Sequence, residues 1–105
     1  SFYEDWLATM RRQTDKSLFT VGEYWSTEIQ SLQNYLTEVK ESMYLFDVPL
    51  HYNFFNASNS NGNFDMRTIF DNTLVKLNPE KAVTFVDNHD TQPRSIFIFL
   101  DSRMV

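Results

Sequence analysis

Hydrophobic residues along the chain follow two spacings in turn, and this alternation predicts helices and strands in succession. Over some stretches apolar residues recur every three or four positions, as on the buried face of a helix. These predicted helices are residues 2–13, a stretch capped by Ser26 or Thr27 that ends near Val39, and residues 64–77. The faces expected to be buried are Ile29, Leu32, Leu36 and Val39 in the second helix and Met66, Ile69, Phe70 and Leu74 in the third. Short apolar runs lie between them, as in the buried strands of a parallel sheet. These predicted strands are residues 18–25, 43–50 and 82–86.

This succession predicts an α/β fold in which about three parallel strands alternate with their helices. Residues 51–57 are rich in aromatic side chains and predict a helix or a long turn, whereas residues 56–63 are rich in Ser and Asn and predict a surface loop. Pro49 and Pro79 are expected to end the elements near them. A parallel sheet of this size has two open edges. We therefore expect further chain to be needed for stable folding.

Composition and charge narrow the classes of function. The chain has 105 residues, a net charge of -5 and no cysteine. The acidic balance disfavours nucleic acid as a partner, because no basic stripe is available to neutralise phosphates. No apolar run approaches the roughly 18 residues of a membrane span, so no membrane partner is expected. Without cysteine there are no disulfides or thiolate metal sites, and the compartment stays open between the cytoplasm and secretion.

Polar side chains gather where the predicted strands end. Glu23 follows the first apolar run, and Asn88, His89 and Asp90 follow the third. Because the carboxyl ends of parallel strands meet at one edge, Glu23 and Asp90 are expected to share a face. Cleavage of a glycosidic bond needs paired carboxylates, one protonated for the leaving oxygen and one ionised against the developing positive charge. From pattern alone, the favoured interpretation is the plainer one, that both carboxylates end strands and meet solvent.

The residues around these carboxylates each have two interpretations. Asn88 and His89 could hydrogen-bond a polyhydroxylated ligand, or the asparagine could cap backbone groups of a turn. Trp25 could stack on a sugar ring, although aromatic residues more often pack in a core. His51 together with His89 is a weak zinc signal, because the two are far apart in the sequence, and no metal ligand is assigned.

Two further aspartates end predicted strands. Asp47 and Asp87 each follow an apolar run. We expect both to make structural hydrogen bonds to backbone groups instead of contacting a ligand.

Three stretches resemble consecutive blocks of the bacterial α-amylases of the liquefying type. They are residues 19–25 (FTVGEYW), residues 45–52 (LFDVPLHY) and residues 83–93 (VTFVDNHDTQP). The resemblance implies that residues 1–93 are a fragment of a (β/α)8 TIM barrel, from the helix before its fifth strand to the end of its seventh. It also implies cleavage of internal α-1,4 bonds of starch and glycogen with retention, and α-1,4-glucans such as maltooligosaccharides as partners.

The resemblance also implies roles for individual residues. Glu23 would be the general acid/base and Asp90 the carboxylate that stabilises the transition state. His89, Trp25 and Asn88 would contact the substrate. No cofactor is expected in this segment, because the family's calcium ligands lie mostly in earlier segments, and calcium is left to the full-length enzyme.

The chain departs from the family pattern in two places. The family's nucleophile, an Asp in a Gly-Phe-Arg-x-Asp-like block, has no match here, so the isolated chain is expected to be inactive. After Pro93 the family continues Gly-Gln-Ser-Leu, whereas this chain reads Arg94-Ser95-Ile96-Phe97. Residues 94–105 are therefore interpreted as a tail that arises from a truncation, a frame shift or fragmentary sequence. For the function of the whole chain, two alternatives to an enzyme fragment stay open. They are a non-catalytic module that binds α-glucan and a structural α/β fragment.

Overall fold

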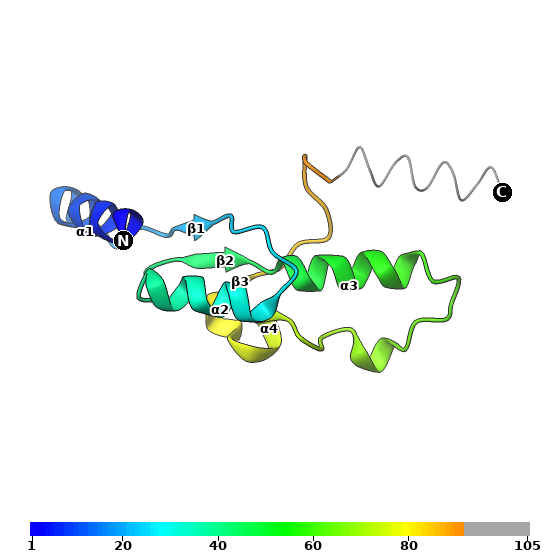
Figure 1. The fold of residues 1–105 in the computed structure, drawn as a ribbon. Coiled ribbons are helices and arrows are strands. Elements are labelled where there is room, and N and C mark those ends of the chain that lie inside the picture. Colours follow the sequence, from blue (N-terminus) through cyan, green and yellow to red (C-terminus); the bar gives the residue numbers. More distant parts are fainter. Residues whose placement is uncertain (92–105) are drawn as a thin grey trace.

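The protein was analysed as a computed structural model, which describes residues 1–91 (Figure 1). Three parallel strands form one sheet in the order β1-β2-β3. They are β1 (Val21–Gly22), β2 (Tyr44–Phe46) and β3 (Ala82–Val83). Leu45 of β2 is central, because it lies opposite both Gly22 and Ala82. The predicted parallel α/β arrangement is confirmed, although each strand is shorter than the apolar run that contains it. The interpretation of residues 94–105 lies outside the described residues.

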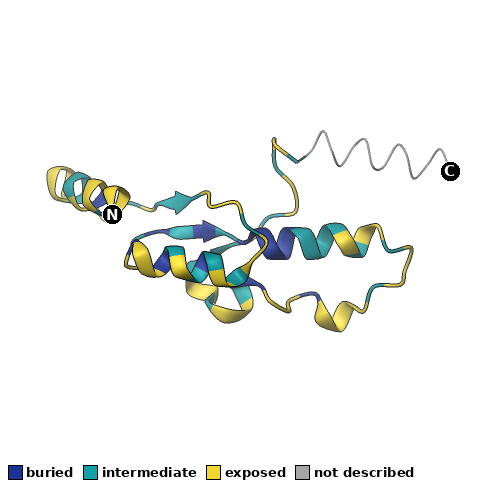
Figure 2. Ribbon diagram, in the orientation of Figure 1, coloured by how far each residue is buried: buried dark blue, intermediate teal, exposed yellow. Residues whose placement is uncertain are grey.

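The first helix, α1 (Phe2–Thr14), agrees with the prediction and starts at a capping box. The Ser1 hydroxyl accepts the Glu4 backbone N–H at 3.3 Å, and the Glu4 side chain reaches back to the amino terminus. This arrangement satisfies backbone donors that the first turn leaves without partners. The apolar face of α1 is exposed for most of its length (Figure 2). Leu7 is 2% exposed, whereas Trp6 is 51% exposed.

The second helix, α2 (Ile29–Glu38), covers the sheet with the face that the sequence predicts. Leu32 and Leu36 are buried and belong to the same cluster as Leu45. The other members of this cluster are Leu7, Val39, Met43 and Leu74. The predicted cap is wrong, because Glu28 occupies the N-cap and makes no side-chain capping bond. Ser26 instead accepts the Glu28 backbone N–H at 3.1 Å, just before the helix begins.

The predicted strand over residues 43–50 is wrong in its second half. β2 ends at Phe46, and α3 (Val48–Ser58) begins two positions later. The Asp47 carboxylate caps this helix by accepting the Leu50 backbone N–H at 3.2 Å. Pro49 lies in the first turn, where a missing N–H costs nothing. Residues 51–57, for which a helix or a long turn was expected, are helical, and the surface loop predicted from residue 56 begins only after Ser58.

The predicted helix over residues 64–77 is also wrong, because the segment is broken. It contains the 3₁₀ turn η1 (Met66–Thr68) and the short helix α4 (Leu74–Leu77). Asn72 lies between them with a φ of 54°, in the left-handed region that interrupts a helix. The expected apolar face is correspondingly divided, with Leu74 buried and Met66 and Phe70 exposed. The turn η2 (Pro79–Lys81) then leads into β3.

Candidate active site at the carboxyl edge of the sheet

The carboxyl ends of β1, β2 and β3 form one edge, because all pairs in the described sheet are parallel. Glu23 directly follows β1, and Asp90 lies in the turn beyond β3. β2 separates the two strands, as the sequence predicts. Both carboxylates are exposed. Acidic side chains that meet solvent at this edge are available to a ligand, in keeping with the position of active sites in parallel α/β proteins.

Asp47 directly follows β2 at the same edge, and its carboxylate is hydrogen-bonded to backbone N–H groups of the protein itself. The carboxylate is 0% exposed and accepts three backbone N–H groups. The donors are Leu50 at 3.2 Å, Leu74 at 3.1 Å and Val75 at 2.7 Å. The predicted structural hydrogen bonding of Asp47 is therefore confirmed. It fixes the starts of α3 and α4 relative to β2.

The turn beyond β3 is held by its own polar side chains. The amide oxygen of Asn88 accepts the backbone N–H groups of Asp90 and Thr91, both at 3.0 Å. The Asp87 carboxylate accepts the Asn88 N–H at 2.9 Å and the Thr91 hydroxyl. The structural role predicted for Asp87 is confirmed. Asn88 caps the turn, and its contact with a substrate stays a prediction.

His89 and Asp90 project from this turn into solvent. His89 Nε2 lies 3.4 Å from Asp90 Oδ1, and both side chains are exposed. An exposed pair of this kind adds little stability, about 0–1 kcal/mol. The two side chains are thus adjacent and accessible, one a carboxylate and the other an imidazole that can donate hydrogen bonds.

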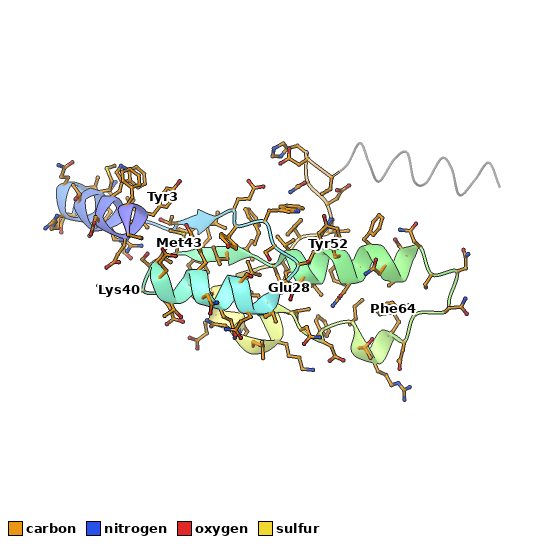
Figure 3. The ribbon with its side chains drawn as sticks, viewed as in Figure 1. Tyr3, Glu28, Lys40, Met43, Tyr52 and Phe64 are labelled. Carbon is orange, nitrogen blue, oxygen red and sulfur yellow. The ribbon has the colours of Figure 1, made fainter. Side chains whose placement is uncertain are left out.

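An aromatic cluster joins the segments that follow the three strands. Its members are Trp25, Phe46, His51, Tyr52 and Phe85. The Trp25 ring is 40% exposed and packs at 6.1 Å from Phe85 and 6.3 Å from Tyr52 between ring centroids. Its indole N–H donates to the Tyr52 hydroxyl at 3.4 Å. Tyr52 lies on α3 beside the edge of the sheet (Figure 3). Trp25 is therefore held by the cluster while part of its ring remains accessible.

His51 is a residue at this edge to which sequence reasoning assigned no role. It is 3% exposed, and its Nδ1 lies 2.7 Å from the carbonyl oxygen of Val86. The sequence signal was a histidine inside the apolar block of residues 45–52, which is typical of a buried, hydrogen-bonded ring. Within residues 1–91, no three His, Asp or Glu side chains are grouped closely enough to hold a metal ion.

The fold of the described residues defines a broad class, a parallel α/β protein. No protein-family model matches the chain. The chain is 59% identical over 93 residues to the α-amylase of Geobacillus stearothermophilus. It is 50% identical over 93 residues to the glucan 1,4-α-maltohexaosidase of Bacillus sp. (strain 707). It is 46% identical over 92 residues to the cytoplasmic α-amylase of Escherichia coli (strain K12).

These matches cover 88–89% of the chain but only 17–19% of the relatives. The chain is therefore a homologue of one segment of the bacterial α-amylases. The resemblance seen in the sequence is confirmed at this level. Within the described residues, no helix is long and apolar enough to cross a membrane.

Proposed function

We propose that this chain is part of a starch-hydrolysing α-amylase that cleaves internal α-1,4 bonds with retention. In this proposal its strands are the fifth to seventh of a (β/α)8 barrel, and Glu23 and Asp90 face the bound glucan. The observation that carries the proposal is the 46–59% identity to proteins named for cleavage of α-glucans or starch. It is also supported by the exposure of Glu23, which directly follows β1, and of Asp90, in the turn beyond β3.

The proposed roles follow from the chemistry of the side chains. Glu23 protonates the leaving glycosidic oxygen and then removes a proton from the attacking water. Asp90 stays ionised, accepts hydrogen bonds from sugar hydroxyls and favours the distorted ring of the transition state. His89 donates hydrogen bonds to the hydroxyls of the glucose at the cleavage point. Trp25 offers its accessible ring to the apolar face of a sugar, and Asn88 adds a polar contact at the turn.

The chain alone is inactive in this proposal, because a retaining mechanism needs a nucleophile that the matching blocks do not contain. A (β/α)8 barrel typically takes about 250 residues, so the remaining strands and the nucleophile must come from elsewhere. Any calcium would likewise be held by other segments. The test must therefore be made in a complete enzyme.

The experiment uses an exchange chimera. In it, the 93 matching residues of the Geobacillus stearothermophilus α-amylase are replaced by those of this chain. Release of reducing sugar from starch is expected for the chimera and lost on Glu23→Gln, by about three orders of magnitude or more, because no other group replaces the acid. Binding of a maltooligosaccharide should persist in this variant.

The matched control is Glu80→Gln. Glu80 is an exposed glutamate in η2, at the amino end of β3, so the same substitution there should leave turnover unchanged. A chimera that folds and binds maltooligosaccharide without turnover would favour the glucan-binding alternative. Turnover that survives Glu23→Gln would refute the assignment of the acid.

A further inference from the structure

We propose that His51 is a positioning residue, which holds the segment bearing Asn88, His89 and Asp90 against the carboxyl edge of the sheet. The inference rests on the proposed function, because it concerns how the same site is held together. His51 lies in the first turn of α3, and its ring is buried. It does not project from the edge as Asp90 does, so its contribution is to the geometry of other residues.

The first observation is a hydrogen bond across 35 positions of the sequence. His51 Nδ1 lies 2.7 Å from the carbonyl oxygen of Val86. A carbonyl oxygen only accepts, so Nδ1 carries the proton and donates it. The β2–β3 pairing reaches only as far as the bond from Asp47 N–H to the Val83 carbonyl at 2.9 Å. The His51 bond therefore fixes the chain beyond the last sheet bond and before the turn that carries Asp90.

The second observation is the packing of the imidazole ring. It stacks on Phe85 with 4.8 Å between ring centroids and 9° between ring planes. Two further rings meet it in edge arrangements, the adjacent Tyr52 at 5.1 Å and Trp25 at 6.1 Å between ring centroids. One ring thus touches the segment after β1 and the segment after β3. These two segments bear Glu23 and Asp90, whose relative position a glycosidase must hold.

The two contacts can be separated by substitution in the exchange chimera. His51→Asn places an amide N–H near the position of Nδ1 and removes the ring. His51→Phe keeps a stacking ring and removes the donor. Asn53→Ala is the matched control, because Asn53 also lies on α3 and donates to a backbone carbonyl, that of Ile69 at 2.8 Å, in the segment before α4.

The His51→Phe variant is expected to lower kcat for a maltooligosaccharide by about tenfold with KM nearly unchanged, the size expected for one lost buried hydrogen bond. The His51→Asn variant, which keeps an N–H donor, should retain most of the kcat that the His51→Phe variant loses. Asn53→Ala should lower the melting temperature and leave kcat unchanged. If His51→Phe changes only the melting temperature, as Asn53→Ala does, His51 is merely structural and the inference is overturned.

Hydrogen exchange of the folded exchange chimera provides a readout that needs no activity. His51→Phe should speed exchange at the amides of Asn88 and Asp90 by about tenfold, and Asn53→Ala should not. Equal exchange in the two variants would overturn the inference. An inactive chimera, or one that tolerates Glu23→Gln, would count against the proposed function, and the exchange result would still decide the role of His51.

Discussion

The carboxylate of Asp47 accepts the backbone N–H of Val75 at 2.7 Å, across 28 positions of the sequence. The same side chain also caps α3 through Leu50 and binds the first N–H of α4 through Leu74. One buried carboxylate thus satisfies the orphan donors of two helices and ties both to the end of β2. Asp47 thereby positions α3, which carries His51 and Tyr52 of the candidate active site.

Asp47→Ala is expected to destabilise the exchange chimera by about 2–4 kcal/mol, because three buried N–H groups lose a charged acceptor. Urea denaturation would measure the shift. Asp47→Asn is the matched variant, since it keeps one acceptor oxygen and should lose less. Equal midpoints for the Ala variant and the parent would show that water replaces the carboxylate without cost.

Gly22 should not tolerate a larger side chain. A Cβ at this position would lie 2.6 Å from the Met43 sulfur and 3.2 Å from Leu45 Cδ2, both buried. Gly22→Ala is therefore expected to cost about 1–3 kcal/mol through overpacking next to Glu23. Thermal denaturation of the chimera would measure this loss.

A double-mutant cycle with Met43→Leu identifies the cause. If the clash with the sulfur dominates, the double variant should lose less stability than the two single losses together. Strictly additive losses would contradict this explanation and point to the β1 backbone.

The ion pair between Glu4 of α1 and Lys40, which follows α2, predicts that the packing of α1 against the rest of the chain depends on pH. Glu4 Oε1 lies 3.0 Å from Lys40 Nζ, and the hydrogen bond from Lys40 holds the pKa of Glu4 below its ordinary value of 4.5. A lowered folded-state pKa gives stability that is present above the ordinary value and is lost as the pH falls through the folded value. We therefore expect α1 to loosen from the rest of the chain at a pH below about 4.5. The fluorescence of Trp6, which lies on α1, would measure this change.

The control for this prediction is Glu4→Gln, which cannot titrate. Its Trp6 signal should be flat over the same interval. A parent protein with an equally flat signal would show that solvent screens the pair completely, as happens for many exposed pairs.

The apolar face of α1 predicts self-association of the isolated chain. Phe2, Tyr3 and Trp6 are exposed there, and β1 and β3 are the edges of the described sheet. Exposed aromatic faces and open strand edges favour contacts between copies. Sedimentation of the 105-residue chain should show oligomers, and fewer of them for Trp6→Lys. Thr9→Lys is the charge-matched control on α1, and a monomeric parent would refute the prediction.

The sequence was most informative where a single property decided the outcome. The spacing of Leu32 and Leu36 identified the buried face of α2, because periodic burial depends only on positions within the helix. The continuous apolar runs located all three strands of the described sheet and their parallel order. Glu23 and Asp90 follow the first and third of these runs, and their meeting at one site stays a prediction.

Sequence reasoning failed at two boundaries between elements. Residues 48–50 read as a strand by composition, yet they start α3, because the Asp47 carboxylate caps its first turn through Leu50 and also binds Leu74 and Val75. Residues 64–77 had helical spacing, but capping at Thr73 and the left-handed Asn72 divided them.

What the sequence by itself determined is therefore the alternation of helices with parallel strands and the buried face of α2. These follow from periodicity and from the geometry of parallel strands, which need no knowledge of distant contacts. Only the tertiary structure decided where β2 becomes α3 and how His51 reaches Val86. Both depend on hydrogen bonds between residues about 30 positions apart, and such pairings arise only when the chain has folded.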